Sequence, residues 1–261
     1  MTFLCVSDQI DPLVYSTSVK ERYGDVDAVF CAGDVNMDYV DFIVSTLNKP
    51  VYFVFGNHNL SEYTFYEKSH KAQFIADASS VKNHASDYSH VHGGDYAGRK
   101  VLKDRHLTFT NPATGKKTPL LIAGISGSIR YNKGQSQFTD REMFFQLLGL
   151  IPKLIWNKIR YGRYLDIFLT HSPPRHLHDK EDACHKGFKC FRWFLKKFRP
   201  PLMIHGHIHL YDIQQSRTIE FEDTKIINAF SHVIIEMKEK ESKKSKKGEK
   251  LDFTISCITD R

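Results

Sequence analysis

Polar residues of metal-binding type follow four short hydrophobic runs in this 261-residue chain. The four endings are Ser7-Asp8, Gly33-Asp34, Gly56-Asn57-His58-Asn59 and Gly206-His207-Ile208-His209. Carboxylate, amide and imidazole groups are common ligands of divalent metals in proteins. A pair of such metals activates water for attack on phosphorus and stabilises the displacement that follows. The residue types therefore indicate a metal-binding surface suited to phosphate chemistry.

The hydrophobic runs before these endings read as buried parallel strands, because they are apolar throughout and do not alternate with polar residues. They span residues 3–6, 26–31, 51–55 and 202–205. In an open α/β sheet, groups just beyond the carboxyl ends of the strands converge on one crevice. We therefore expect the polar endings to lie close together. A fifth strand, 165–169, ends at Thr170-His171 and adds another imidazole to this set.

The first part of the chain has the pattern of a βαβαβ unit with right-handed crossovers. One helix is expected from Asp11-Pro12 to Gly24 and a second over 37–47. Further expected elements are a strand at 120–125, a helix from Thr139 through Leu148, an amphipathic helix at 187–198, and β segments near 225–230, 233–237 and 251–258.

The length and the hydrophobic content predict one domain over residues 1–261. Residues 60–118 read as an insertion or edge region, with a helix near 63–76 and a tight loop at 92–99 before another strand. Residues 238–250 read as a basic, flexible loop. The start of the chain has no cleavable leader pattern, and no apolar run is long enough to span a bilayer.

The net charge of +7 raises the question of a nucleic-acid partner. Residues 238–250 hold seven lysines and three glutamates, so more than half of the excess lies in that one segment. The small remainder disfavours a nucleic-acid groove. The five cysteines are odd in number and scattered, and they read as reduced core thiols, which favours a cytoplasmic location. No membrane partner is expected.

The motifs at Asp8, Gly33-Asp34, Gly56-Asn57-His58-Asn59, His171 and Gly206-His207-Ile208-His209, taken in this order, resemble those of the calcineurin-like metallophosphoesterase superfamily. The resemblance covers residues 8–209. It implies a four-layer α/β/β/α sandwich of two mixed sheets with flanking helices. It also implies metal-dependent hydrolysis of a phosphomonoester or a phosphodiester.

The resemblance further implies roles for individual residues. Asp34 would bridge two metals. Asn57, His171 and His207 would complete one metal site, and Asp8 with His209 would hold the other metal. His58 would not bind metal but would contact phosphate and protonate the leaving group, which imidazole can do near neutral pH. The loop 127–131 would line the site, with Arg130 gripping phosphate through its planar guanidinium.

One position departs from the pattern. The first motif of the family is Asp-x-His, and here it is Asp8-Gln9-Ile10, so one imidazole ligand is missing. Either Gln9 or Asp11 supplies an oxygen in its place, or this site is weak or empty. Oxygen ligands favour Mn or Mg, while Fe and Zn remain candidates, and one or two ions per chain are open.

A second polar cluster lies between two of the motifs: His176, His178, Asp179, Asp182 and His185. In a loop near the site, His185 or Asp179 would contact the substrate or the metal ligands. A separate zinc site of Cys184, His185 and Cys190 is disfavoured. The expected substrate is a phosphorylated small molecule or protein. Two alternatives remain: a binding scaffold without hydrolysis, which Ile10 motivates, and a nuclease, which the basic charge motivates.

Overall fold

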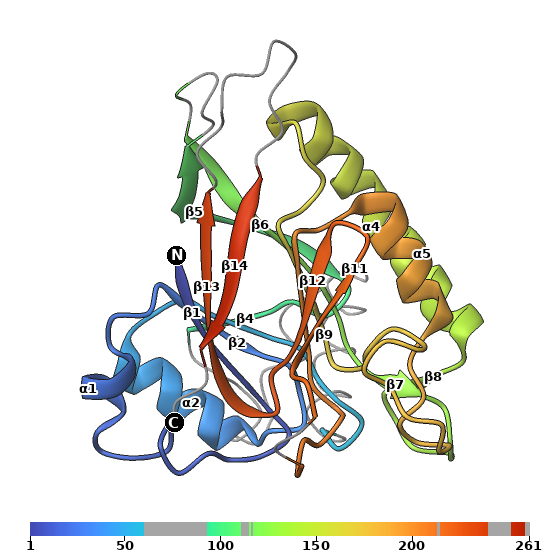
Figure 1. Cartoon of the computed structure of the whole chain (residues 1–261), viewed down its shortest axis with the longest axis horizontal. Coiled ribbons are helices and arrows are strands. Elements are labelled where there is room, and N and C mark those ends of the chain that lie inside the picture. Colours follow the sequence, from blue (N-terminus) through green and yellow to red (C-terminus); the bar gives the residue numbers. More distant parts are fainter. Residues whose placement is uncertain (60–92, 111–114, 116, 213–214, 240–251, 259–261) are drawn as a thin grey trace, which may run out of the picture.

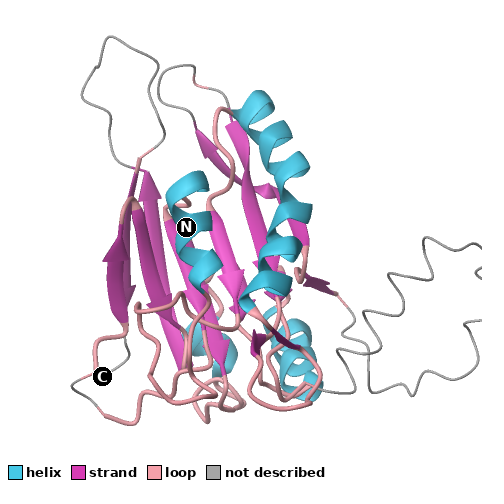
Figure 2. Ribbon diagram, turned by 90° about the vertical axis from the view of Figure 1, so that its right-hand side faces the viewer, coloured by secondary structure: helices cyan, strands magenta, loops and turns pink. Residues whose placement is uncertain are grey.

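The computed structural model describes residues 1–59, 93–110, 115, 117–212, 215–239 and 252–258. Two six-stranded sheets pack face to face, and helices cover the outer face of each (Figure 1). Helices α1 and α2 lie at one side of the molecule and α4 and α5 at the other, with both sheets between them. Figure 2, turned by 90°, shows the strands running side by side beneath the helices.

The first sheet has the order β14-β13-β1-β2-β3-β4. Strands β1 to β4 run parallel, whereas β13 and β14 are antiparallel to their neighbours, so the sheet is mixed. The strand bounds are β1 Thr2–Ser7, β2 Ala28–Cys31, β3 Val51–Phe53, β4 Gly94–Tyr96, β13 Ser231–Glu239 and β14 Phe253–Ile258.

The second sheet has the order β11-β12-β10-β9-β6-β5 and is also mixed. Strands β12, β10, β9 and β6 are parallel, and the two edge strands are antiparallel to their neighbours. The strand bounds are β5 Lys100–Thr110, β6 Lys117–Ile125, β9 Ile167–Thr170, β10 Leu202–His205, β11 Thr218–Phe221 and β12 Thr224–Asn228. A small parallel pair, β7 Ser128–Ile129 with β8 Gln137–Phe138, lies in the chain between β6 and the helix that follows it.

Three hydrophobic layers separate the four layers of secondary structure. The central layer lies between the sheets and contains Phe30, Leu120 and Ile204. A second layer packs α1 (Val19–Tyr23) and α2 (Met37–Leu47) on the first sheet. A third packs α4 (Asp140–Tyr161) and α5 (Lys189–Phe198) on the second sheet. The expected α/β/β/α sandwich is therefore confirmed.

Two helices differ from their expected lengths. The pattern predicted a helix from Asp11 to Gly24, but turns occupy 12–18 and only α1 is helical. The carboxylate of Asp11 accepts a hydrogen bond from the backbone N–H of Leu13, which stabilises a turn instead. Helix α4 begins at the predicted cap, Thr139, but continues through Pro152 to Tyr161. Its later turns persist because they bury Leu150 and Leu154 against the second sheet.

The edge region was predicted less well. Residues 94–96, expected within a tight loop, form β4, the edge strand of the first sheet. Strand β5 forms an edge of the second sheet. The helix expected at 63–76 lies outside the described residues, as does most of the basic segment 238–250.

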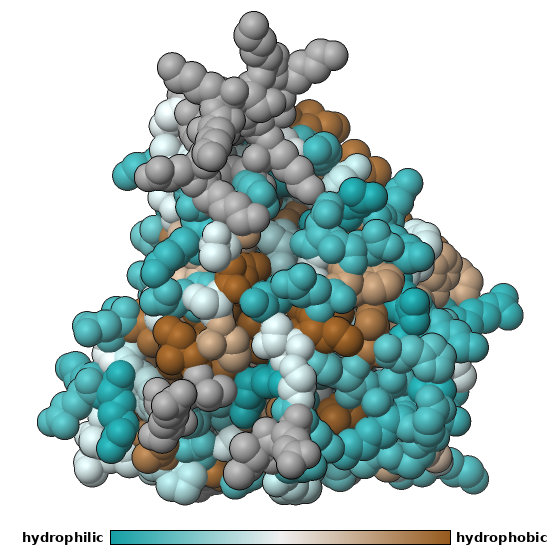
Figure 3. All heavy atoms as spheres, viewed as in Figure 1, coloured by the Kyte–Doolittle hydropathy of each residue, from teal (hydrophilic) through white to brown (hydrophobic). Residues whose placement is uncertain are grey.

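All five cysteines are free, but they are not all core residues. Cys5, Cys31 and Cys190 are buried, whereas Cys184 and Cys257 are partly exposed. Hydrophilic side chains predominate on the face shown in Figure 3, and hydrophobic colour occurs there in separate patches. Within the described part of the chain, no helix has the length and apolar character needed to cross a bilayer.

Candidate metal centre

The polar endings converge on a cavity of about 260 Å³ at the carboxyl ends of strands from both sheets. Asp8, Asp34 and Asn57 follow β1, β2 and β3 of the first sheet. His171 and His207 follow β9 and β10 of the second. Nine of the described residues line the cavity: Asp8, Asp34, Asn57, His58, Tyr131, Cys184, His185, His207 and His209.

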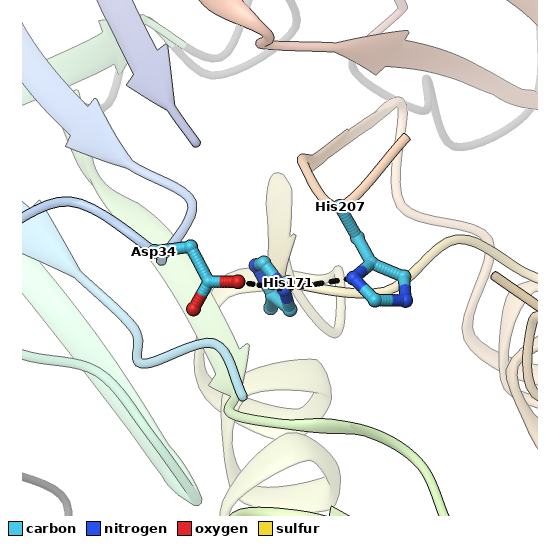
Figure 4. A group of neighbouring side chains, drawn as sticks. All are labelled: Asp34, His171 and His207. Atoms are coloured by element: carbon cyan, nitrogen blue, oxygen red, sulfur yellow. Dashed lines mark hydrogen bonds and ion pairs between the residues drawn. The ribbon is translucent and has the colours of Figure 1, made fainter. Parts of the chain in front are cut away.

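His171 lies at the centre of one group of ligand-type atoms (Figure 4). Its Nε2 is 3.2 Å from Oδ2 of Asp34, 3.1 Å from Nδ1 of His207 and 3.3 Å from Oδ1 of Asn57. Ligands of a single ion bound at about 2.1 Å stand roughly 3 to 3.5 Å apart. The three distances from Nε2 of His171 therefore lie in the range found between ligands of one ion.

Backbone carbonyls fix both imidazoles in the orientation that metal binding requires. Nδ1 of His171 lies 2.8 Å from the carbonyl oxygen of Ala32, and Nε2 of His207 lies 2.7 Å from that of Cys184. A carbonyl oxygen only accepts hydrogen bonds, so these two nitrogens carry protons. The opposite nitrogens then present lone pairs to the group, an arrangement typical of metal-ligating histidines. The donor set thus fits a divalent cation.

The pKa values show how strongly these groups interact. Burial opposes ionisation of Asp34, but the charge of His171 outweighs it and lowers the pKa of Asp34 to about 2. Burial likewise disfavours a charged His171, but Asp34 raises its pKa to about 9. Burial and the nearby charge of His171 lower the pKa of His207 to about 3. At neutral pH a proton therefore occupies Nε2 of His171, and a cation that binds there would displace this proton and accept the lone pair.

The strand ends turn sharply to aim these side chains into the cavity. Asp8, Asp34 and His207 all have left-handed backbones, with φ of 63°, 53° and 69°. Such angles are strained for residues other than glycine and cluster at functional sites. Glycines allow the close packing: a Cβ on Gly56 would lie 2.0 Å from Oδ1 of Asp34, and one on Gly206 would lie 2.6 Å from Oδ2 of Asp8.

Asn59 holds two of these turns together. Its Oδ1 accepts hydrogen bonds from the backbone N–H groups of Asp34 and Gly56, and its Nδ2 donates one to the carbonyl of Val35. The side chain is buried, and the bonds to Gly56 and Val35 lie away from solvent. The second asparagine of the Gly-Asn-His-Asn motif therefore joins the ends of β2 and β3.

A second group contains Asp8 and His209. Nε2 of His209 is 3.9 Å from Oδ1 of Asp8, and its Nδ1 is 2.7 Å from the hydroxyl of Tyr211. Both oxygens of Asp8 accept from the backbone N–H of His207, at 2.9 Å. Burial raises the pKa of Asp8 and lowers that of His209. Since Asp34 lies on the same cavity, a second ion would share it with these two residues.

The residues after Asp8 that carry side-chain oxygens, Gln9 and Asp11, do not contribute to this group. Ile10 is 40% exposed, and Gln9 is exposed as well. The carboxylate of Asp11 is engaged elsewhere: it accepts from the hydroxyl of Ser231, the ring of His232 at 2.6 Å and the N–H of Leu13. With its carboxylate engaged in this way, Asp11 does not replace the missing imidazole, and Gln9 is not among the described residues that line the cavity.

His58 is exposed at the cavity, and its backbone N–H donates to Oδ1 of Asp34 at 2.8 Å. Arg130, expected to bind phosphate, points elsewhere: its guanidinium forms an ion pair with Glu142 at 2.8 Å and donates to the carbonyl of Gln137. From the same loop, Tyr131 lines the cavity, and its hydroxyl accepts from Nδ2 of Asn57 at 3.2 Å.

The residues of the second polar cluster, which lies at 176–185, have different partners. Asp179 accepts hydrogen bonds from Arg175 and from the backbone of His176 and Gly187, so it shapes the loop. His178 pairs with the buried His205 at 3.1 Å. His185 lines the cavity, with its ring centroid 5.4 Å from that of His207 and 6.5 Å from that of His209.

The sequence did not point to three contributors. Tyr131 adjoins Arg130 in a loop already expected at the site, so only the choice of side chain was missed. Asn59 belongs to a recognised motif, but its role depends on the turn it holds. The carbonyl of Cys184 has no signal in the sequence, because any residue offers the same oxygen.

Comparison with known proteins identifies similar sequences and folds. The sequence profile of a family described as calcineurin-like phosphoesterase matches residues 1–211. One crystal structure has 11% sequence identity and a TM-score of 0.56, with 89% of this chain and 93% of that chain covered. The crystal structure of TT1561 of Thermus thermophilus has 13% identity and a TM-score of 0.53, with coverages of 88% and 89%. These likenesses show the fold. A search of curated protein sequences gave no significant match.

Proposed function

Because this chain belongs to the calcineurin-like phosphoesterase family, we propose that it hydrolyses a phosphomonoester or a phosphodiester in a metal-dependent reaction. The observation that carries the proposal is the group around Nε2 of His171, where atoms of Asp34, Asn57 and His207 lie 3.2, 3.3 and 3.1 Å from this nitrogen. The substrate would be a phosphorylated small molecule or protein.

In this proposal the residues divide the work by position. Asp34 joins the two halves of the centre, since its Oδ2 faces His171 and its side chain lies on the same cavity as Asp8. Asn57, His171 and His207 complete one ion site, and Asp8 with His209 contributes to the other. Carbonyl hydrogen bonds keep the rings of His171 and His207 in the ligating tautomer.

Divalent ions held by these residues would supply a Lewis acid for the phosphoryl oxygen and would lower the pKa of water, and manganese suits this mixture of oxygen and nitrogen ligands. His58 lies at the open side of the cavity and donates a proton to the departing oxygen. The hydroxyl of Tyr131 contacts Asn57 and can donate to phosphate. Arg130 would reach phosphate only by leaving Glu142. The free cysteines agree with our proposal of a cytoplasmic location.

The alternative is a binding scaffold that has lost hydrolysis, and Ile10 is the observation that favours it. A scaffold needs no leaving-group acid, so an exposed His58 at the cavity argues for the enzyme. The nuclease alternative depends on a basic excess that lies mainly at 238–250.

The decisive experiment uses the purified protein, with metals measured by mass spectrometry and generic mono- and diester substrates assayed with added Mn²⁺. We expect turnover in wild type and its loss in Asp34→Asn, together with loss of bound metal. The matched control is Asp38→Asn, an exchange of the same chemistry on helix α2, which should keep both. Absence of turnover with every divalent metal would refute the hydrolase and favour the scaffold.

A further inference from the structure

We propose that His185 is a metal ligand and replaces the imidazole that the first motif lacks at Ile10. This inference rests on the proposed metal centre and assigns a further ligand to it. The group formed by Asp8, Asp34 and His209 offers three ligand side chains, and neither Gln9 nor Asp11 adds a fourth. The ring of His185 lines the same cavity from the loop between β9 and α5.

The spacing of the rings fits a shared centre. Two imidazoles bound to one ion at about 2.1 Å hold their ring centroids roughly 4.5 Å apart at right angles and roughly 6.4 Å apart on opposite sides of the ion. The centroid of His185 is 6.5 Å from that of His209, close to the separation of two ligands on opposite sides of one ion. For comparison, the centroids of His171 and His207, whose nitrogens face each other at 3.1 Å, are 4.8 Å apart. His185 therefore stands at a ligand's distance from the group that needs one.

Asp182 prepares His185 for this role. Nδ1 of His185 lies 2.7 Å from Oδ1 of Asp182, and the carboxylate accepts a hydrogen bond from the ring N–H. The proton is thereby fixed on Nδ1, and Nε2 keeps the lone pair that a metal requires. A carboxylate behind a histidine is the arrangement that orients metal-ligating imidazoles and increases their basicity.

The thiol of Cys184 supports the same arrangement rather than competing with it. Its Sγ lies 3.0 Å from Oδ1 of Asp182 and 3.4 Å from Nδ1 of His185, on the side of the ring that faces the carboxylate. The backbone carbonyl of Cys184 meanwhile accepts from Nε2 of His207. Cys184 thus connects the loop that carries His185 to His207, a proposed ligand of the neighbouring ion site.

The test counts bound ions. Wild type, His185→Ala and the double variant Ile10→His/His185→Ala are loaded with Mn²⁺, passed through gel filtration and analysed by mass spectrometry, with dissociation constants from calorimetry. We expect two ions in wild type, one in His185→Ala and two again in the double variant, because Ile10→His restores the imidazole of the family motif. Asp182→Asn should lower the binding affinity for one of the two ions by about 10- to 100-fold.

The matched control is His176→Ala, which removes an exposed imidazole from the same loop and should leave two ions bound. The proposal is overturned if His185→Ala binds two ions with wild-type affinity, or if wild type binds one. It is also overturned if Ile10→His restores nothing, because the loss would then come from damage to the loop. Binding of two ions that depends on His185, in a protein that hydrolyses no phosphoester, would leave this inference intact and refute the proposed function.

Discussion

His58 is the residue on which the choice between an enzyme and a scaffold depends. Its backbone N–H is fixed to Asp34, while its side chain lies at the exposed side of the cavity. Removal of the ring therefore leaves the ligand atoms around His171 in place. What is lost is a proton donor for the leaving group, and general acid catalysis typically contributes 10²- to 10⁴-fold to a rate.

We predict that His58→Ala keeps the wild-type number of bound ions and loses about 10²-fold or more in kcat on esters of poor leaving groups. The loss should be much smaller for nitrophenyl esters, whose leaving group departs without a proton. Steady-state kinetics on both substrate types measures this difference, and His106→Ala, an exposed histidine on β5, is the control. Equal losses on both substrates would contradict an acid role.

Single residues in loops were the hardest to assign from sequence. Arg130 has the charge expected of a phosphate ligand, yet Glu142 attracts it at 2.8 Å. Glu142 itself completes the capping box of α4 with Thr139. The local demand for a helix cap therefore decides where the guanidinium points, and the chemistry of arginine alone does not reveal this.

At the scale of elements, the centre depends on how closely strand ends approach one another. Gly56 follows β3, and a Cβ there would lie 2.0 Å from Oδ1 of Asp34 and 2.6 Å from Cε1 of His171. Neither side chain can move without breaking the ligand group. Gly149, in the middle of α4, has open space instead of close neighbours, because nothing lies within 4 Å of a Cβ placed there.

We predict that Gly56→Ala destabilises the fold by about 1 to 3 kcal/mol, the usual cost of overpacking, and abolishes metal binding. Gly149→Ala should stabilise the protein by up to about 1 kcal/mol, because alanine is the better helix former, and should leave metal binding unchanged. Urea unfolding and metal analysis of both variants measure these effects. Wild-type metal affinity in Gly56→Ala would show that the close approach is not required.

Strands were predicted from sequence more accurately than helix ends. The apolar runs before the motifs correspond to β1, β2, β3, β9 and β10 to within two residues at each end, because buried parallel strands have no polar alternation to obscure them. Helix α4 continues beyond its predicted end at Leu148 and passes through Pro152, a residue type that normally ends a helix. Burial of Leu154 against the second sheet outweighs the one missing hydrogen bond, a tertiary effect that local sequence does not contain.

For the whole molecule, the candidate centre connects the two sheets. Its carboxylates come from β1 and β2 and its imidazoles from β9 and β10, so a bound ion would cross-link layers that otherwise meet through apolar side chains. Anything that binds the folded state alone stabilises it, by about 4 kcal/mol at a thousand times its dissociation constant.

We predict that removal of metal by EDTA lowers the Tm by roughly 10 °C, because a domain of this size shifts by about 2 to 4 °C for each kcal/mol. Added Mn²⁺ should restore the original Tm. Asp34→Asn, which lacks the shared ligand, serves as the control, and its Tm should be the same with and without EDTA. A wild-type Tm that EDTA leaves unchanged would show that no ion joins the sheets.

Strand β1 has a position with consequences for how the protein is made. It lies between β2 and β13, and Thr2 is paired with Glu236 across more than two hundred residues. During synthesis, the strand that leads to Asp8 leaves the ribosome more than two hundred residues before β13, its second neighbour. Until then it presents an unpaired hydrophobic edge, which is prone to pair with other chains. The first residues of the candidate centre are thus among the last to reach their final surroundings, so a nascent chain cut short before β13 would carry the motifs without a finished sheet to hold them.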